Sequence, residues 1–308
     1  MNIKKKYIVA TRPSLLAFTQ TQQTVDLLKE KKPDCEFEIV KFSTQGDKVT
    51  DKPLTEFGGT GVFVMELENA ILQGKADFAV HSLKDVPSIQ PEGLILASFP
   101  KREDPRDVIL IKNGLNINEL KDNCVIGTGS PRRMVQIAEI KPKAIFKDLR
   151  GNIDTRIKKL NDGHYDAIII ASAGLKRLGK QINEKAFLSI DSCIPAIGQG
   201  AITIECKKDD KETIELLRTI NDKDTELSII AERSYMKTIG GGCKFPLGAF
   251  AIKENGVLHL SVMIGNHHTN QIIRMSGNSS PAEAEKLGKT LAEKIIIETE
   301  RQEIKIEF

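Results

Sequence analysis

The side chains best suited to chemistry in this sequence are arginines placed where a strand-like run gives way to a helix-like one. They are Arg12, Arg132, Arg133, Arg150 and Arg156, and Arg177 in the run AGLKRLG is a further arginine of the set. A guanidinium group binds a carboxylate or phosphate through two parallel hydrogen bonds, and a helix N-terminus offers an anion its unpaired N–H groups. Because an arginine there opposes the helix dipole, the fold alone is not expected to place it. The set predicts an anion site, although a solvated basic face would account for any one member.

The run VHSLKDVP, residues 80–87, is the second candidate. It reads as a buried strand that ends in polar side chains, and open α/β sheets bind ligands at such strand ends. Asp85 is a candidate acid–base group and Lys84 a further anion ligand, although a surface Lys–Asp pair fits the pattern equally well. His81 alone is expected to be structural.

A thiol follows three glycines in IGGGCKFPLGAF, residues 239–250. Structural cysteines prefer packed elements, so Cys243 on such a loop is either incidental or presented to a ligand. The other four cysteines are scattered, with no CxxC or zinc spacing, which predicts free thiols in a reducing, cytoplasmic compartment. His267 and His268 lack a third metal ligand near them, so no metal is expected.

Composition narrows the classes of partner. The 308 residues carry a formal net charge of only +3 and no Trp, which argues against a nucleic-acid surface or a base-stacking platform. No apolar run approaches the roughly 18 residues of a membrane span. The turns GTGSPRR and GQGA lack the spacing of nucleotide-binding loops. We therefore expect neither a nucleic acid nor a membrane as partner.

The first two-thirds of the chain alternates strand-like and helix-like runs. Strands are expected at 7–10, 37–42 and 76–81, with helices at 13–30 and 61–74. A second, similar unit begins near residue 105, and its helix at 131–140 has Ser130 as N-cap and Pro131 at the first position. This alternation predicts mainly parallel sheets covered by helices. The run GQGAITIEC is one more strand, which can return to the first unit.

The last portion follows a different pattern. Asn255-Gly256 joins two strand-like runs, the strongest short hairpin signal. A third strand, QIIRMSG, precedes a closing helix with a capping box of Ser280 and Glu283 and with Pro281 in its first turn. We expect a small α+β domain with Cys243 at its entry.

An ordered set of motifs closely resembles the hydroxymethylbilane synthase, or porphobilinogen deaminase, family. The motifs are ATRPSLLAFTQ, HSLKDVP, REDPRDV, RGNIDTR, YDAIIIASAGLKRLG, PAIGQGAITIEC and AERSYMKTIGGGCKFPLGAFA. They run from Ala10 to Ala251 in matching order. Each is weak by itself, but the set is very specific.

The resemblance implies an α/β fold of two similar domains around a cleft, like type II periplasmic solute-binding proteins, plus a small α+β C-terminal domain. Domain 1 would comprise 1–100 and 197–220, domain 2 would be 101–196, and domain 3, with a three-stranded antiparallel sheet and a helix, would be 221–308. The protein would be a monomer.

The same resemblance implies a transferase of tetrapyrrole biosynthesis. Such enzymes condense four porphobilinogen molecules head to tail, lose ammonia at each step, and release the linear hydroxymethylbilane with water. The chain grows on a dipyrromethane cofactor held by a thioether, and Cys243 matches the cysteine that carries it.

Individual roles follow from matching positions. Asp85 matches the catalytic carboxylate. Cofactor-binding positions are Ser82, Lys84, Asp85, Thr128, Ser130, Arg132 and Arg133. Substrate-binding positions are Arg12, Ser14, Gln20, Phe63, Arg150, Asn152, Arg156, Arg177 and Gln199.

The chain departs from the family pattern in two places. Glu56 and Thr60 stand where many relatives have lysines, so the charge-dependent role of that loop is in doubt here. Gly129 replaces a common Ser and removes one hydroxyl ligand, while Pro131 replaces a common Leu and preorganises the helix start. A rival interpretation, a two-lobed anion or amino-acid receptor, explains the arginines but not the thiol that follows the glycines.

Overall fold

The computed structural model describes residues 6–44, 61, 64–112, 117–240 and 246–304. By its internal contacts the chain forms two compact units. Unit 1 is Met1–Glu103 with Ala201–Leu227, and unit 2 is Asp104–Gly200 with Ser228–Phe308. Unit 2 thus takes in most of both the second and the third predicted domain. The three-domain division remains a prediction.

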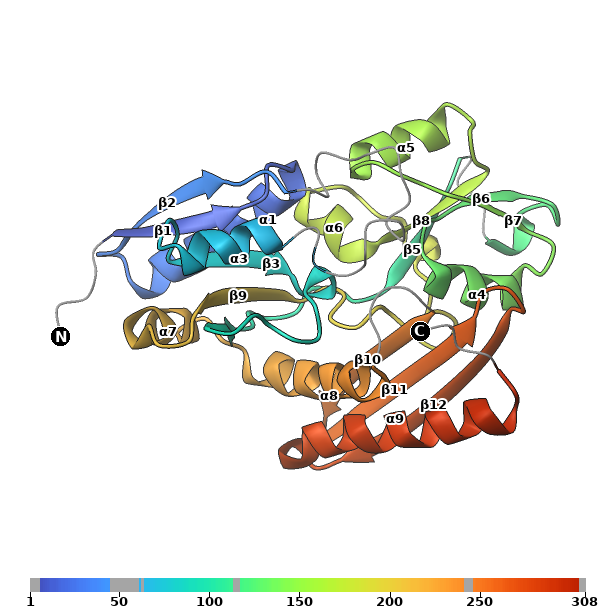
Figure 1. Ribbon diagram of the computed structural model, residues 1–308. Helices are drawn as coiled ribbons and strands as arrows, with labels where there is room; N and C mark the ends of the chain where they lie inside the picture. The colour runs from blue at the N-terminus through green and yellow to red at the C-terminus, as the bar shows by residue number, and fades with distance from the viewer. Residues whose placement is uncertain (1–5, 45–60, 62–63, 113–116, 241–245, 305–308) are drawn as a thin grey trace. The chain divides into compact units, whose positions relative to one another are not determined.

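Unit 1 is built on a five-stranded sheet in the order β2-β1-β3-β9-β4 (Figure 1). The strands are β1 Lys6–Thr11, β2 Glu36–Lys41, β3 Phe78–Ser82, β4 Leu94–Ser98 and β9 Ile202–Lys207. β9 pairs antiparallel with both β3 and β4, while β1 pairs parallel with β2 and β3. The predicted return of this late segment to the first unit is confirmed. Half of the strand pairings are antiparallel, because β9 runs against both of its neighbours, so the sheet is mixed and not mainly parallel as predicted.

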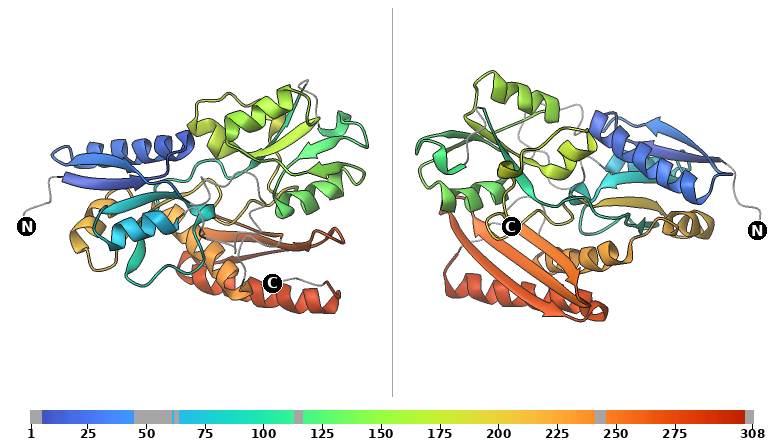
Figure 2. Two further views of the ribbon diagram at one scale, coloured as in Figure 1. Left: turned by 45° about the horizontal axis from the view of Figure 1, so that its top comes forward. Right: turned by 180° about the vertical axis from the view of Figure 1, so that it is seen from behind.

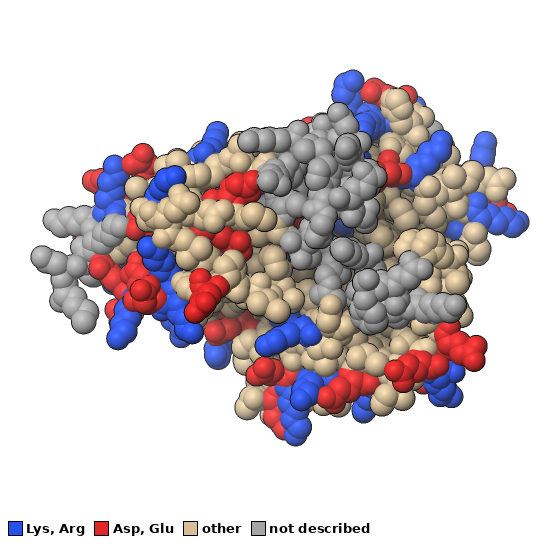
Figure 3. Space-filling view, in the orientation of Figure 1, with Lys and Arg blue, Asp and Glu red and all other residues tan. Residues whose placement is uncertain are grey.

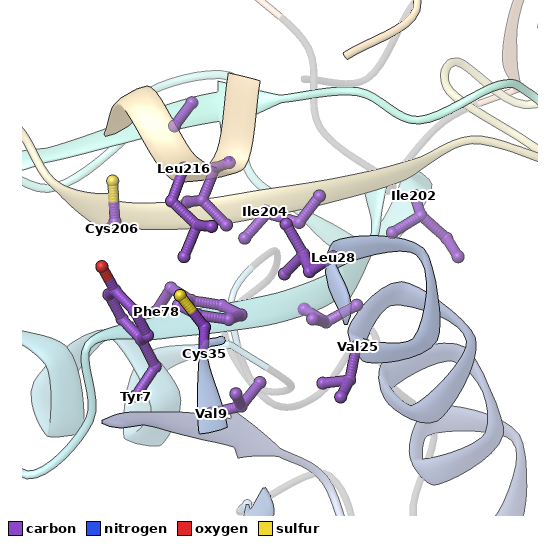
Figure 4. Packing of buried hydrophobic residues seen from close by; sticks show 13 residues of the cluster. Tyr7, Val9, Val25, Leu28, Cys35, Phe78, Ile202, Ile204, Cys206 and Leu216 are labelled. Atoms are coloured by element: carbon purple, nitrogen blue, oxygen red, sulfur yellow. The ribbon is translucent and has the colours of Figure 1, made fainter. Parts of the chain in front are cut away.

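Helices cover both faces of this sheet. They are α1 Leu15–Lys31, α3 Met65–Leu72 and α7 Lys211–Arg218. On one face Val25 and Leu28 of α1 pack with Phe78 and Ile204 (Figure 4). On the other face α3 packs against a smaller apolar cluster. The expected helix start at Pro13 is wrong, because Ser14 is the N-cap and accepts from the Ala17 N–H.

Unit 2 contains a four-stranded sheet in the order β5-β8-β6-β7. Its strands are β5 Asp107–Ile111, β6 Val125–Gly127, β7 Ile145–Lys147 and β8 Ala167–Ala171, and its helices are α4 Pro131–Ile140, α5 Ile153–Asn161 and α6 Ser172–Arg177. Only β5 is antiparallel to its neighbour. Pro131 opens α4 after Ser130, as the sequence predicts.

The C-terminal part of unit 2 is the expected antiparallel sheet with helices. It comprises β10 Leu247–Glu254, β11 Val257–Asn266, β12 Gln271–Ser279, α8 Lys223–Ile239, which begins in unit 1, and α9 Ala284–Arg301. Asn255 and Gly256 both have positive φ, at 49° and 80°, which confirms the hairpin. α9 packs along the sheet, chiefly on β12 and β11 (Figure 2).

The capping box predicted for the last helix is not formed. Pro281–Glu283 makes a 3₁₀ turn, and α9 begins only at Ala284. Ser280 donates to the Glu283 carboxylate at 3.4 Å and makes no capping bond to a backbone N–H. Proline at the first position fixes φ for the turn, so the chain enters α9 without the reciprocal cap.

Candidate functional site

Two neighbouring parallel strands end together in unit 1. β1 pairs with β3 in parallel, with Val9 opposite Phe78, so their carboxyl ends meet at one edge of the sheet. β1 leads into Arg12 and Ser14, and β3 ends at Ser82. The Ser82 hydroxyl donates to Oε1 of buried Gln20 at 3.0 Å. The structure thus brings these predicted positions together at one sheet edge.

The 3₁₀ turn Leu83–Asp85 directly follows β3. Its backbone is held at both ends, because the Leu83 N–H donates to the Ala201 carbonyl at 3.1 Å and the Val86 N–H donates to the Leu83 carbonyl at 3.0 Å. Lys84 and Asp85 are half-buried. The turn therefore presents an ammonium and a carboxylate from a fixed backbone at the strand end.

Unit 2 holds a buried ionic cluster around Asp107, the first residue of β5. Arg132 donates to Asp107 Oδ2 at 2.7 Å, and Arg133 donates to Oδ1 at 3.1 Å from Nε and at 2.7 Å from Nη2. Gln199 Nε2 also donates to Oδ1, at 2.9 Å. Asp107 is 0% exposed, and Arg132 and Arg133 are 4% and 7% exposed.

This cluster corrects one premise of the sequence analysis. The fold does place Arg132 and Arg133, since they also donate to the backbone carbonyls of Ile194 and Ile169 respectively. Among the described residues each guanidinium donates three hydrogen bonds. A guanidinium has five N–H groups, so donors remain on both arginines after the fold has been satisfied.

The charges in the cluster do not cancel. Burial alone would raise the pKa of Asp107, but the guanidinium groups of Arg132 and Arg133 outweigh it and hold that pKa well below its usual range. Burial raises the pKa of the nearby Cys193 thiol to about 12, so the thiol is neutral. Two cations therefore face one anion. A buried excess of one positive charge is costly, and a carboxylate ligand would neutralise it.

The start of α4 adds two hydroxyls to this region. Thr128 is buried, and its hydroxyl oxygen accepts from the Ser130 N–H at 3.2 Å. Ser130 is the N-cap residue but makes no side-chain capping bond. A Cβ on Gly129 would lie 2.5 Å from Asp148 Oδ1, so Asp148 would have to move for a serine to fit here. The contact is with the end of a flexible side chain, so a serine here needs only a shift of Asp148.

The predicted positions around RGNIDTR gather at the start of α5. Asn152 is its N-cap and accepts from the Thr155 N–H at 2.8 Å. Arg150 pairs with Asp148 at 2.9 Å, and Arg156 donates to the Gly151 carbonyl at 2.8 Å. Since β6 and β7 pair in parallel, this group and the start of α4 share the carboxyl edge of the sheet.

Two further predicted residues hold the turn that precedes β9. Arg177, at the end of α6, donates to the Gly200 carbonyl at 2.7 Å. Gln199 is buried and donates to the Pro105 carbonyl at 2.7 Å as well as to Asp107. Arg177 and Gln199 therefore both fix the 198–200 turn.

Sequence reasoning missed two buried carboxylates in this unit. Asp107 is one, although it lies within the quoted motif REDPRDV. Glu232 of α8 is the other, with Oε2 accepting from the Gly198 N–H at 2.7 Å and Oε1 from the Ala251 N–H at 2.8 Å. A single acidic residue in an otherwise apolar run was the available signal for each.

The structure gives no position for some of the residues singled out in the sequence. Cys243, Phe63, Glu56 and Thr60 lie outside the described residues. Within the part of the chain that is described, no cluster of His, Cys, Asp and Glu could hold a metal ion. Nor is any described helix long and apolar enough to cross a membrane. The expectation that no metal takes part stays a prediction.

On the face shown in Figure 3, the described residues carry basic and acidic side chains close together. Along the lower edge of Figure 3, Lys and Arg side chains alternate with Asp and Glu. Helix α9 carries the ion pairs Lys289–Glu293 and Arg301–Glu298. Nucleic-acid surfaces concentrate basic side chains on one face, and α9 does not have that pattern.

Comparison with known proteins decides the family. Residues 7–215 match the family model described as "Porphobilinogen deaminase, dipyromethane cofactor binding domain", and residues 226–296 match its C-terminal domain. The chain belongs to the porphobilinogen deaminase family. A curated porphobilinogen deaminase from Brevibacillus brevis is 43% identical over 292 residues, which cover 94% of each chain. The recognition made from the motifs is confirmed, and so is the dipyrromethane cofactor.

Some solved structures resemble this member of the porphobilinogen deaminase family distantly in fold. The second substrate-binding domain of an amino-acid ABC transporter from Streptococcus pneumoniae is 16% identical, with 76% and 94% of the two chains covered and a TM-score of 0.44. The second substrate-binding domain of Lactococcus lactis GlnP is 15% identical, with 77% and 91% covered and a TM-score of 0.42. These scores are too low to carry an argument. The α/β class follows from the sheets themselves.

Proposed function

We propose that this chain is a transferase that condenses four porphobilinogen molecules, with loss of ammonia at each step, and releases hydroxymethylbilane. The observation that carries the proposal is the buried cluster of Arg132, Arg133 and Asp107, which has an excess positive charge and unused donors. Porphobilinogen bears carboxylate side arms, and guanidinium groups suit carboxylates. The family match supports the same substrate.

The donor set fits the carboxylated cofactor of the family. The residues that we assign to hold dipyrromethane are Ser82, Lys84, Asp85, Thr128, Ser130, Arg132 and Arg133. When bound, it supplies the pyrrole end on which the product chain grows. Three hydroxyls, one ammonium and two guanidinium groups would bind its side arms, and Cys243 would carry its thioether.

The chemistry that we assign to Asp85 is electrostatic and proton-transferring. When porphobilinogen loses ammonia, a cationic azafulvene is left, and a nearby carboxylate stabilises that charge. In its protonated form the Asp85 side chain can give a proton to the leaving amine, and the carboxylate that results can remove one from the coupled ring. The half-buried 3₁₀ turn at the end of β3 supports this role, because it holds the carboxylate on a fixed backbone.

The remaining predicted positions are proposed to line the path of substrate and product. They are Arg12, Ser14, Gln20, Phe63, Arg150, Asn152, Arg156, Arg177 and Gln199. In unit 2 several of them also fix local backbone, so they would bind substrate from a preorganised frame. We further propose that the protein acts as a monomer in the cytoplasm.

The intact mass of the protein tests this function directly. Protein purified from cells that make porphobilinogen should exceed its sequence mass by one dipyrromethane. Cys243→Ser should remove the extra mass and the turnover of porphobilinogen, while the control Cys124→Ala, at a buried thiol of unit 2, should retain both. An unmodified wild-type mass would contradict the enzyme assignment and would favour a two-lobed binding protein.

A further inference from the structure

Three ionisable side chains are buried on one face of the unit 1 sheet, apart from the residues assigned above. Glu205 on β9 is 0% exposed, His81 on β3 is 4% exposed, and Glu68 on α3 is 7% exposed. β3 and β9 pair antiparallel, with Ala79 opposite Glu205 and His81 opposite Thr203. Because side chains alternate along a strand, His81 and Glu205 project to the same face, which α3 covers.

The side chains of His81 and Glu205 meet across these strands. His81 Nε2 lies 3.2 Å from Glu205 Oε2, with side chains only 3% and 0% exposed. Within the described part of the chain, no hydrogen bond of good geometry reaches either carboxylate oxygen of Glu205. The interaction is therefore electrostatic in the main, without the additional donors that usually offset the burial of a carboxylate.

Stability alone does not account for this arrangement. The surroundings are apolar, with Ala10, Leu67, Ile71 and Ala79 in the cluster beneath α3. Replacing a buried ion pair by apolar residues of similar volume is often neutral or stabilising, whereas removing one partner is strongly destabilising. A polar pair in this apolar layer can instead hold β3 and β9 in one position relative to each other.

The pair lies where β3 passes into the functional turn. His81 directly precedes Ser82, and the 3₁₀ turn with Lys84 and Asp85 comes next. Its side chain ties the end of β3 to β9 on the α3 face, while Ser82 bonds to Gln20 from α1. The strand end is thus held from both faces of the sheet immediately before the turn.

We propose that His81, paired with Glu205, is a positioning residue that sets the orientation of Lys84 and Asp85. It touches neither substrate nor cofactor and acts through the backbone of the turn. Errors of about 1 Å in the placement of catalytic groups can lower rates a hundredfold. The activity part of this inference rests on the function proposed above.

A double apolar variant separates positioning from stability. His81→Leu/Glu205→Leu should unfold at a urea concentration no lower than the wild type and keep the dipyrromethane mass. Its kcat should fall between about tenfold and a hundredfold, with KM changed less than about twofold. Exchange of the Val86 amide hydrogen, which bonds to the Leu83 carbonyl, should be faster than in wild type. His164→Leu, at an exposed histidine, should match wild type in all four measurements.

The outcomes discriminate between the two proposals. A stable double variant with wild-type kcat and Val86 exchange would overturn the positioning role. If the double variant does not fold, His81→Asn/Glu205→Gln takes its place with the same readouts, and failure of both to fold would show a purely structural pair. A wild-type protein without turnover would instead refute the proposed function, and Val86 exchange would still test the positioning.

Discussion

Glu68 should make the stability of unit 1 depend on pH, and Glu68→Gln should remove that dependence. The pKa of Glu68, on the buried side of α3, is raised to about 7, because burial and then the negative charge of Glu205 raise it more than His81 lowers it. An unperturbed glutamate titrates near 4.5. Between these values the folded chain keeps a proton that the unfolded chain has released.

The sign and size of the effect follow from this difference. Stability falls as pH rises wherever the folded state binds more protons than the unfolded state. Each pH unit of difference corresponds to about 1.4 kcal/mol, so the gap between 4.5 and about 7 amounts to about 3 kcal/mol. The wild type should lose up to this amount between pH 4.5 and pH 7 and little more above pH 8. Water entry around ionised Glu68 would reduce the loss.

Hydrogen exchange of the β3 and β9 amides measures the free energy of opening of unit 1 alone. Comparing wild type with Glu68→Gln at each pH cancels the intrinsic pH dependence of exchange. The free energy of opening should be similar in the two proteins at pH 5, and the variant should be more stable by about 1–3 kcal/mol at pH 8. The control Glu92→Gln, at an exposed glutamate of the same unit, should follow the wild type at both values.

A constant difference between wild type and Glu68→Gln from pH 5 to pH 8 would refute the reasoning. It would mean that Glu68 titrates alike in the folded and unfolded chains. A variant that is less stable than wild type at pH 8 would refute it as well, because ionised Glu68 would then be a favourable partner of His81.

Two further predictions concern aspartates. Asp107→Asn leaves Arg132 and Arg133 buried without a counter-charge, so the free energy of unfolding measured in urea should fall by about 3–5 kcal/mol. A fall of less than about 1 kcal/mol would contradict the cluster's role. The control is Asp162→Asn, at an exposed aspartate. Asp85→Asn should retain the dipyrromethane mass but lose at least about a hundredfold in turnover, and near-normal turnover would remove Asp85 from the mechanism.

Local patterns in the sequence predicted most elements of the fold. The alternation of apolar runs located β1, β2 and β3, and Asn255-Gly256 located the last hairpin. The helix expected at 61–74 ends with Gly74, which adopts a φ of 70° just after α3. These features depend on a few neighbouring residues, and so they can be read from a single sequence.

Sheet order could be predicted only in part, because it depends on pairings between distant segments. β4 was not anticipated, although Leu94–Ser98 is a short apolar run. Its place at the sheet edge depends on β9, which lies about a hundred residues further along the chain. The return of β9 was predicted as a possibility, but its antiparallel direction between β3 and β4 was not.

The candidate site was predicted from its cations, and their anionic partners were missed. Arg132 and Arg133 stood out because they open a helix, whereas Asp107 was not singled out in the motif REDPRDV. Twenty-five residues separate Asp107 from Arg132. No spacing rule connects them, since β5 and α4 meet only through the packing of the sheet.

The missed carboxylates share a property that a sequence can display. Asp107 opens DVILI, Glu205 interrupts AITIEC, and Glu232 interrupts SIIAERSY. Each borders or interrupts an apolar run, where burial without a partner would be prohibitive. Each has a buried counterpart in the structure: two guanidinium groups, an imidazole and two backbone N–H groups respectively. A lone acid in a predicted buried element thus implies a nearby donor, and at Asp107 the search for that donor leads directly to the arginines of the anion site.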